Sequence, residues 1–315
     1  MKNLYAFFLF LFINTCSFAQ EVNIYWGKEN PVDHSSSTYL IGRRGNLLLG
    51  CKRSRKSTSI VKYDFEDLQV KGEHLIIGQK DSKAGGKLID NDYAFENIYM
   101  MKHKTYVCVT KYDRKADKNS IYMQEIDDNG SLTGSLKKLA DISASSRRNS
   151  GSFLVFTSND STKILIVNNP PFDKYAGEKF GFEIFDENLK ELNNLSIALP
   201  YKDKNFAAED YILGNDGNIY MQAQIFLEKK EKSKDEAKYY YEILAINPSG
   251  KGEVTEYEIK LSGKYITDIS YRLDDDKIIC SGFYGDVQAK GSSIKGIFFM
   301  RINKNTKQAE VTGVK

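Results

Sequence analysis

The sequence predicts an all-β protein built from repeated four-stranded antiparallel units. Three observations support this prediction. Aromatic residues make up 12% of the 315 residues, including 20 tyrosines and 18 phenylalanines, which favours half-buried sheets. Hairpin turns recur about every 57 residues, centred near Gly45, His103, Asp160, Asp216 and Asp275. A second series of turns keeps step with the first, at residues 64–67, 127–130, 186–188, 247–250 and 303–306.

Each unit therefore has two tight turns separated by a variable loop, and four consecutive strands. The clearest unit predicts strands at Tyr211–Leu213, Asn218–Phe226, Tyr239–Ile246 and Glu253–Lys260. A four-stranded meander that repeats at this period is typical of a β-propeller blade. A β-sandwich is the alternative, since it also has short strands and regular turns, but that fold gives no reason for so long a period.

The two turn series divide the chain into five units. We predict blades at residues 39–90, 91–148, 149–206, 207–262 and 263–315. Residues 20–38 are interpreted as an N-terminal arm or as the outer strand that closes the ring. An unclosed ring exposes a sheet face, so the blade number stays open between five, six and an incomplete larger ring.

Residues 1–19 have the features of a secretory signal peptide. Lys2 precedes an apolar run at residues 4–13, and Ser17 and Ala19 stand at the −3 and −1 positions of a cleavage site. The apolar run is shorter than the ~20 residues that a membrane-spanning helix needs. Cys16 leaves a lipid-anchored form as the alternative. We expect an exported protein, in the periplasm, on the outer surface or outside the cell.

Cysteine and histidine offer little chemistry in this sequence. Cys51, Cys108 and Cys280 follow their turn centres by five or six residues, so we expect equivalent, buried, unpaired side chains. The three histidines lie in different segments, and no zinc, calcium, phosphate-binding or nucleophile motif is present. We expect neither a metal nor a cofactor. The acidic run 274–276 is interpreted as a capped turn, with a cation site as the alternative.

Basic residues concentrate on one predicted face. In a meander, the loops between the second and third strands lie at the same end as the connections between blades. These segments are rich in lysine and arginine, whereas the tight turns at the other end are rich in aspartate and glutamate. A basic face attracts an anionic partner, although solvated loops without a ligand would have the same composition. The candidate ligand-binding residues are Lys52, Arg53, Arg55, Lys111, Arg114, Arg147 and Arg148.

One segment carries a resemblance to a known group of proteins. The run Ile279–Asp286, with Gly282-Phe283-Tyr284, is followed by Ser293–Phe299, with the pattern SIKGIFF. This strand–loop–strand element resembles one found in uncharacterised envelope proteins of Gram-negative bacteria that carry signal peptides. The resemblance covers mainly the last two units. It implies a β-propeller fold and a chain that continues further, and it implies no catalytic residues.

We therefore predict an exported, non-enzymatic binding or scaffold module. Its partner would be an anionic envelope polysaccharide or a protein, bound by the basic face and compatible with peripheral association with the envelope. Because the formal charge is only +3 and the protein is expected to be exported, we expect no nucleic-acid partner. The alternative is a glycan hydrolase or lyase that uses carboxylates at the propeller axis, with Glu209, Asp210 and Asp268 as candidates.

Overall fold

The computed structural model describes residues 34–78, 89–90, 92–171, 177–227, 238–286 and 293–314. The predicted signal peptide, and the predicted arm up to residue 33, lie outside the described residues. The described chain forms five four-stranded antiparallel sheets and one short 3-10 helix, η1 (Asp203–Asn205). None of its helices is long and apolar enough to cross a membrane.

In every sheet the four strands are neighbours in chain order, which is the meander that the two turn series predicted. The strands of blades 1 and 2 are β1 (Ser36–Arg44), β2 (Leu47–Ser54), β3 (Thr58–Asp64), β4 (Val70–Ile77), β5 (Ala94–Met100), β6 (Thr105–Asp113), β7 (Lys118–Ile126) and β8 (Leu132–Ser143). Those of blades 3, 4 and 5 are β9 (Ser152–Thr157), β10 (Lys163–Asn169), β11 (Gly177–Asp186), β12 (Glu191–Lys202), β13 (Phe206–Leu213), β14 (Ile219–Phe226), β15 (Tyr239–Asn247), β16 (Glu253–Ile259), β17 (Lys264–Leu273), β18 (Lys277–Asp286), β19 (Gly296–Asn303) and β20 (Ala309–Val314).

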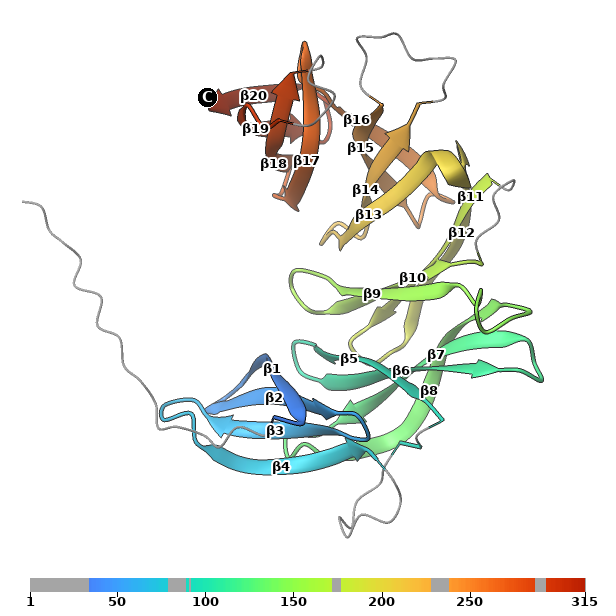
Figure 1. Cartoon of the computed structure of the whole chain (residues 1–315), viewed down its shortest axis with the longest axis vertical. Coiled ribbons are helices and arrows are strands. Elements are labelled where there is room, and N and C mark those ends of the chain that lie inside the picture. The colour runs from blue at the N-terminus through green and yellow to red at the C-terminus, as the bar shows by residue number, and fades with distance from the viewer. Residues whose placement is uncertain are drawn as a thin grey trace, which may run out of the picture.

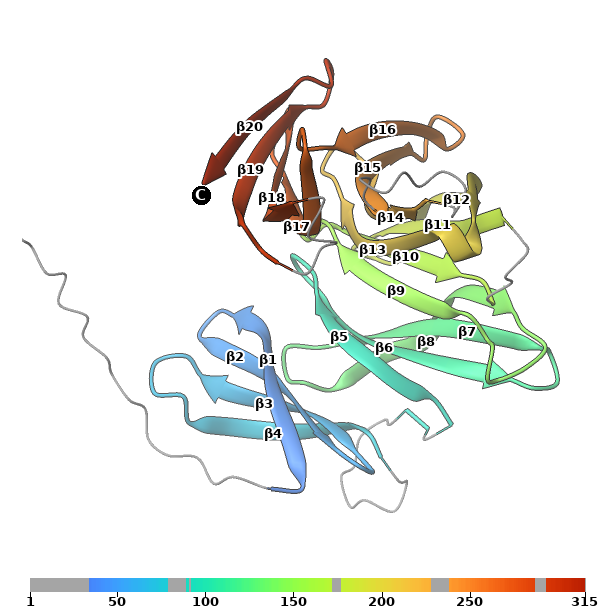
Figure 2. The same cartoon turned by 45° about the horizontal axis from the view of Figure 1, so that its top comes forward.

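The five sheets follow one another along an arc, with blades 1 and 5 at its two ends (Figure 1). Figure 2 shows the first strand of the sheets on the inner side of the arc and the fourth strand on the outer side. This is the blade arrangement of a β-propeller, and it excludes a sandwich of two sheets. One boundary differs from the prediction. Residues 36–38 begin β1 and pair with β2 inside blade 1, so they supply no closing strand to blade 5.

The turn between the third and fourth strands is built in the same way in all five blades. It starts with an aspartate or asparagine whose Oδ1 accepts a hydrogen bond from the backbone N–H two residues later, at Asp64, Asp127, Asp186, Asn247 and Asn303. A residue with positive φ follows three or four positions on, at Leu68, Gly130, Leu189, Lys251 and Lys307. The short polar side chain thus closes the turn locally, which is why Asp and Asn mark it in the sequence.

Four hydrophobic cores hold the blades together, and each combines residues of two consecutive blades. The three cysteines are buried and unpaired in these cores, as predicted. Their predicted equivalence is wrong, however. Cys51 and Cys108 face the following blade, whereas Cys280 packs with Tyr220 and Ile243 of the preceding blade. A difference of one residue along a strand turns a side chain to the opposite face of the sheet.

The first strands carry a recurrent irregularity on the inner side of the arc. A β-bulge interrupts the pairing of β1, β5, β13 and β17 with their neighbours, whereas β9 pairs with β10 in regular register. The extra residues are Ile41, Glu96, Glu209 and Thr267. A bulge leaves one residue outside the ladder and redirects its side chain. Two of the four bulges present a glutamate.

Candidate functional site

A cleft of about 560 Å³ lies between blades 2 and 3. It is on the loop face, which we define as the end of the blades with the second-to-third-strand loops and the inter-blade connections. The opposite end, with the tight turns, is the turn face. The walls come from the starts of β5, β7 and β9, the end of β6 and the connection between β8 and β9. Its lining combines two cations, two carboxylates, three aromatic rings and several hydroxyl and amide groups.

A tight turn presents Arg147 to this cleft. Ser146 and Asn149 form an isolated bridge, and the backbone N–H of Arg148 donates to Ser146 Oγ at 3.2 Å. Gly151 then leads the chain into β9 with φ +69°, and a Cβ there would lie 2.4 Å from the carbonyl oxygen of Asn169. Only glycine fits that backbone. The connection between β8 and β9 is therefore fixed by the turn at Ser146 before Arg147 and by the close packing of Gly151 after it.

Lys111 is the second cation of the cleft, and it is partly engaged. Its Nζ lies 3.6 Å from Asp92 Oδ2 and 4.8 Å from the centroid of the Tyr93 ring. Tyr93 is in turn held edge-on against Tyr122, at 5.3 Å between ring centroids. Arg147 is exposed, and it makes no ion pair within the part of the chain that the structure describes. Arg147 is thus the cation that is available to an incoming anion.

The remaining polar groups of the cleft are also positioned by neighbours. Glu96 is the bulge residue of β5, and Thr110 Oγ1 donates a hydrogen bond of 2.6 Å to its Oε1. The Tyr112 hydroxyl donates to the carbonyl oxygen of Ala144 at 3.1 Å. The half-buried ring of Phe153 completes the aromatic lining. The cleft therefore presents polar and aromatic groups that are held in place by their neighbours.

The other predicted basic residues lie elsewhere on the loop side. Lys52 pairs with Glu73 at 3.1 Å across blade 1, and the Arg53 guanidinium lies 4.7 Å from the centroid of the Phe95 ring. The remaining three are exposed and do not line the cleft, namely Arg55, Arg114 and Arg148. The structure thus brings together Lys111 and Arg147 of the seven candidates. The aromatic residues of the cleft were not singled out, although aromatics beside a basic loop are a recognisable signal.

The candidate axial carboxylates lie on the inner strands of blades 4 and 5. Glu209 Oε2 accepts a hydrogen bond of 2.6 Å from Gln222 Nε2, and Asp210 Oδ1 accepts one of 2.8 Å from the backbone N–H of Tyr211. Asp268 is exposed on β17. Burial, followed by the charges of Glu209, Tyr239 and Asp268, raises the pKa of the Tyr241 phenol, whose hydroxyl donates to the carbonyl oxygen of Thr267 at 3.4 Å. Acidic groups from two adjacent blades therefore lie near one phenol.

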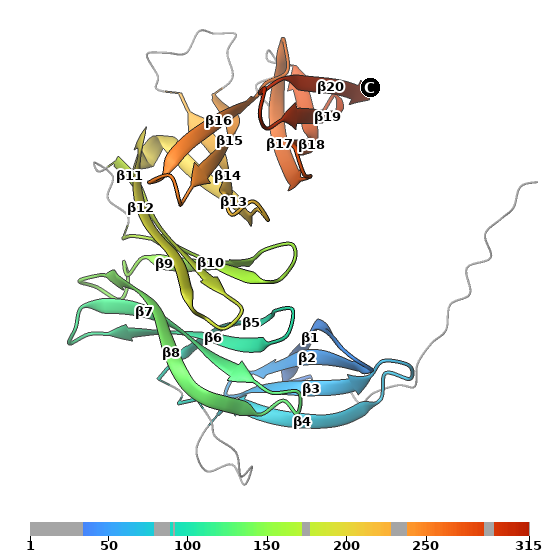
Figure 3. The same cartoon turned by 180° about the vertical axis from the view of Figure 1, so that it is seen from behind.

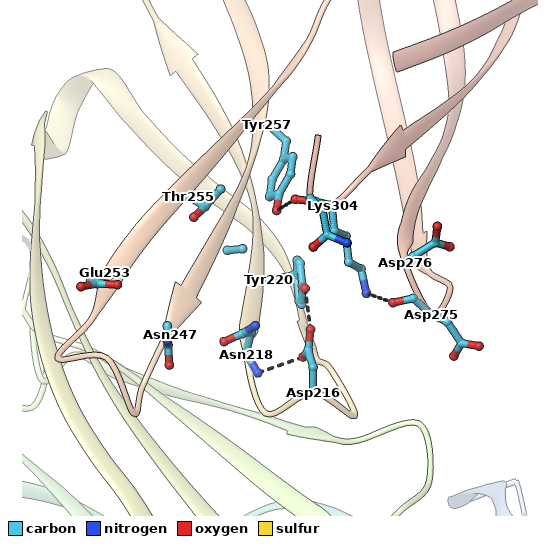
Figure 4. Close-up of a pocket in the computed structure, with 12 residues that line it drawn as sticks. Asp216, Asn218, Tyr220, Asn247, Glu253, Thr255, Tyr257, Asp275, Asp276 and Lys304 are labelled. Atoms are coloured by element: carbon cyan, nitrogen blue, oxygen red, sulfur yellow. Dashed lines mark hydrogen bonds between the residues drawn. The ribbon is translucent and has the colours of Figure 1, made fainter. Parts of the chain in front are cut away.

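A second pocket, of about 330 Å³, lies between blades 4 and 5 on the turn face (Figure 4). Several of the polar groups that line this pocket form hydrogen bonds with one another. The Tyr220 hydroxyl donates to Asp216 Oδ2 at 2.7 Å, and Lys304 Nζ donates to the carbonyl oxygen of Asp275 at 3.0 Å. The Tyr257 hydroxyl donates to the carbonyl oxygen of Lys304 at 2.9 Å. The first contact lies within blade 4 and the second within blade 5, whereas the bond from Tyr257 to Lys304 joins the two blades, so this pocket is best explained as part of their interface.

The acidic run 274–276 belongs to the same region and forms a capped turn, because Asp274 Oδ1 accepts a hydrogen bond from the N–H of Asp275 at 3.0 Å. Among the described residues, no group of three or more histidine, cysteine, aspartate or glutamate side chains could hold a metal ion.

No protein-family model matches the chain, and no curated protein matches it. Solved structures with a similar arrangement include the β-propeller domain of the Trilobed protease from Pyrococcus furiosus (14% identity, TM-score 0.44, 88% of this chain and 71% of that chain). They also include the Dos1 propeller (8%, 0.48, 87% and 58%) and an alpha-L-arabinanase from Penicillium chrysogenum complexed with arabinobiose (11%, 0.45, 90% and 82%). Likenesses at these values assign no activity to this chain.

Proposed function

We propose that the chain is an exported binding module for an acidic saccharide, which it holds in the cleft between blades 2 and 3. One observation carries the proposal. Lys111 and Arg147, from different parts of the chain, meet over a cleft that also contains Tyr93, Tyr112 and Phe153. Export is supported by the sequence of residues 1–19.

An acidic sugar has three features that this lining can recognise. Its carboxylate accepts paired hydrogen bonds from a guanidinium, the role assigned to Arg147. Its hydroxyl groups match small polar side chains such as Asn119 and Ser152. Its apolar ring face can lie against a half-buried aromatic ring such as Tyr112, which is apolar in its body and polar at its tip.

Neither carboxylate of the cleft forms an ion pair with Arg147 among the described residues. Asp92 already lies beside Lys111, and Glu96 accepts the hydrogen bond of Thr110. Arg147 therefore supplies the cation that is least compensated by its surroundings. The hydroxyl, amide and aromatic groups beside Arg147 match a sugar ring as well as its carboxylate, and we therefore favour a saccharide over a protein partner.

The test is calorimetric titration of the purified chain with oligogalacturonate and with a neutral oligosaccharide of equal length. We expect binding of the acidic ligand only. Arg147→Ala should weaken it by roughly 10- to 100-fold, the effect of losing a hydrogen bond to a charged group. Arg148→Ala is the matched control, since Arg148 is adjacent, exposed and outside the cleft. It should change the affinity by less than about twofold.

Salt and a peptide probe complete this test. Raising the ionic strength should weaken binding, because the recognised charges are near the surface. Equal losses in the two arginine variants would contradict the cleft as the site. Binding of polyglutamate in place of oligogalacturonate would replace the saccharide with an acidic protein partner.

A second candidate function is carboxylate-dependent glycan cleavage at the inner strands. It is favoured by the placement of Glu209 and Asp268 near Tyr241 from two adjacent blades. Two carboxylates on either side of a glycosidic bond are the machinery of most glycoside hydrolases. New reducing ends from acidic or neutral oligosaccharides, lost in both Glu209→Gln and Asp268→Asn, would establish it. The absence of products would exclude it for the glycans tested.

A further inference from the structure

A buried acid and a buried amide lie behind one wall of the cleft. Glu183 on β11 and Asn168 on β10 are on the side of blade 3 that packs against blade 2 (Figure 3). Ile166, which pairs with Glu183, and Phe153, which pairs with Asn168, both belong to the core between these blades. Phe153 also lines the cleft. The amide is therefore one strand behind the cleft wall, and the acid is two strands behind it.

The contact between the acid and the amide lacks a donor. Asn168 Nδ2 donates to Glu183 Oε1 at 3.1 Å. Glu183 Oε2 and Asn168 Oδ1 are both buried acceptors that have no hydrogen-bond partner among the described residues. The absence of a side chain at Gly181 leaves room for the amide, since a Cβ there would lie 3.1 Å from Asn168 Nδ2. Buried polar atoms are rarely left unpaired, so these two acceptors need a donor.

The surroundings of Glu183 favour its neutral form. Its side chain is 9% exposed, and it forms no ion pair among the described residues. Burial raises the pKa of Glu183 to about 7, opposed by the hydrogen bond from Asn168 and aided by the charges of Glu191 on β12 and Asp141 on β8. The lysines of the surrounding strands have other partners or are exposed, namely Lys118 and Lys138 with Asp141, Lys137 with the carbonyl oxygen of Leu189, and Lys179 in solvent.

We infer that the pair of Glu183 and Asn168 makes binding in the cleft depend on a proton, an inference that rests on the proposed saccharide site. A protonated carboxyl is a donor, so Oε2 then donates to Asn168 Oδ1 and the pair closes with a second hydrogen bond behind Phe153. Loss of the proton removes this bond, which weakens the support of β9. It also places a negative charge behind a site for an anion, and that charge repels the saccharide carboxylate.

Calorimetric titration with oligogalacturonate at several pH values tests this inference. The ligand carboxylates stay ionised from about pH 6 to about pH 8.5, and no histidine is among the described residues that line the cleft. We expect the affinity of the wild-type chain to fall by roughly three- to tenfold over this range. Glu183→Gln should keep the low-pH affinity throughout, because its amide N–H replaces the O–H of the neutral acid.

Glu242→Gln is the matched control. Glu242 is 8% exposed and accepts a hydrogen bond from the Tyr201 hydroxyl at 3.3 Å, so it is an equally buried acid in the contact between blades 3 and 4, away from the cleft. This variant should keep the pH dependence of the wild-type chain. Circular dichroism checks that both variants fold.

Proton uptake is a second measurement, and it needs no variant. Titrations at about pH 7.5 in two buffers of different ionisation enthalpy should show that binding takes up a fraction of a proton. Binding of equal affinity at every pH, or binding without proton uptake, overturns the inference and leaves the saccharide site standing. So does a Glu183→Gln chain that keeps the wild-type pH dependence. A chain that binds no oligogalacturonate at any pH contradicts the proposed function itself, and the regulation with it.

Discussion

Glu183 is a buried acid at a strand position that is occupied by apolar residues in blades 1, 4 and 5 and by Gln124 in blade 2. It lies on β11, facing blade 2, where Leu244 and Met300 occupy the corresponding places in blades 4 and 5. Asn168 Nδ2 donates to its Oε1 at 3.1 Å, and its Oε2 has no hydrogen-bond partner among the described residues. Burial raises the pKa of Glu183 to about 7, opposed by the hydrogen bond from Asn168 and aided by the charges of Glu191 and Asp141.

This shift predicts that Glu183 makes folding less favourable at high pH. Its pKa is higher in the folded than in the unfolded chain, so between about pH 4.5 and pH 7 the folded state holds a proton that the unfolded state has lost. The contribution to the free energy of unfolding therefore falls as pH rises through that window. It stays low above pH 7, where a charge must be buried.

Glu183→Gln should remove this pH dependence. We expect the free energy of unfolding at pH 8 to rise by about 1–3 kcal/mol, with little change at pH 4. Urea unfolding at several pH values measures it, with Glu310→Gln at an exposed strand position as the control. Parallel pH curves for wild type and Glu183→Gln would show that the carboxyl is solvated in the folded state.

At the scale of elements, the third-to-fourth-strand turns define the blades. Asp186 accepts two backbone hydrogen bonds on the same Oδ1, from Asn188 at 2.8 Å and Lys190 at 2.9 Å. Leu189 in this turn packs on blade 2, and Lys137 Nζ of blade 2 donates to its carbonyl oxygen. The aspartate therefore stabilises both its own turn and a contact between blades.

We expect Asp186→Ala to lower the free energy of unfolding by about 1–3 kcal/mol, since two backbone donors lose their acceptor. Asp186→Asn should cost less than half as much, because asparagine keeps Oδ1 and already fills this position in blades 4 and 5. Guanidinium unfolding measures both variants. An equal loss in the two would mean that the charge of Asp186, and not its acceptor geometry, stabilises the turn.

These turns also explain how far the sequence could predict the fold. Asp and Asn act on the backbone within four residues, so the turn series and the four-strand units are visible locally. The sheet face on which a strand residue lies is harder to predict from the sequence, because a shift of one residue in register moves the side chain to the opposite face. Cys280 was assigned to the wrong face for this reason. The bulges at Glu96 and Glu209 have no local signature and depend on the partner strand.

The candidate site was predictable only in part for a similar reason. Lys111 and Arg147 could be assigned to the correct end of the blades from the order of turns and loops. That they meet, while Arg53 lies over Phe95 of the next blade, depends on how two blades pack. Packing of this kind is decided by side-chain shape at an interface between segments about 40 residues apart, which no local pattern records.

At the scale of the molecule, the described blades form an array in which each hydrophobic core joins two consecutive blades. In such arrays stability is close to a sum of unit and nearest-neighbour contributions. Blades 2, 3 and 4 each contribute to two inter-blade cores, whereas blades 1 and 5 each contribute to one. The ends of the array should therefore open at lower free-energy cost than its centre.

Hydrogen exchange followed by mass spectrometry measures this difference. In dilute solution we expect amides of β2 and β19 to exchange faster than those of β10 and β14. Uniform exchange in all five blades would show that the array opens as one cooperative unit.

The three buried cysteines can report the order in which the contacts between blades open during unfolding. Burial raises the pKa of the Cys280 thiol to about 12, and it also raises those of Cys51 and Cys108, so these thiols are inert while the chain stays folded. Cys51 lies in the core between blades 1 and 2, Cys108 in the core between blades 2 and 3, and Cys280 in the core between blades 4 and 5. The order in which an alkylating reagent modifies the three thiols is therefore the order in which these inter-blade cores open.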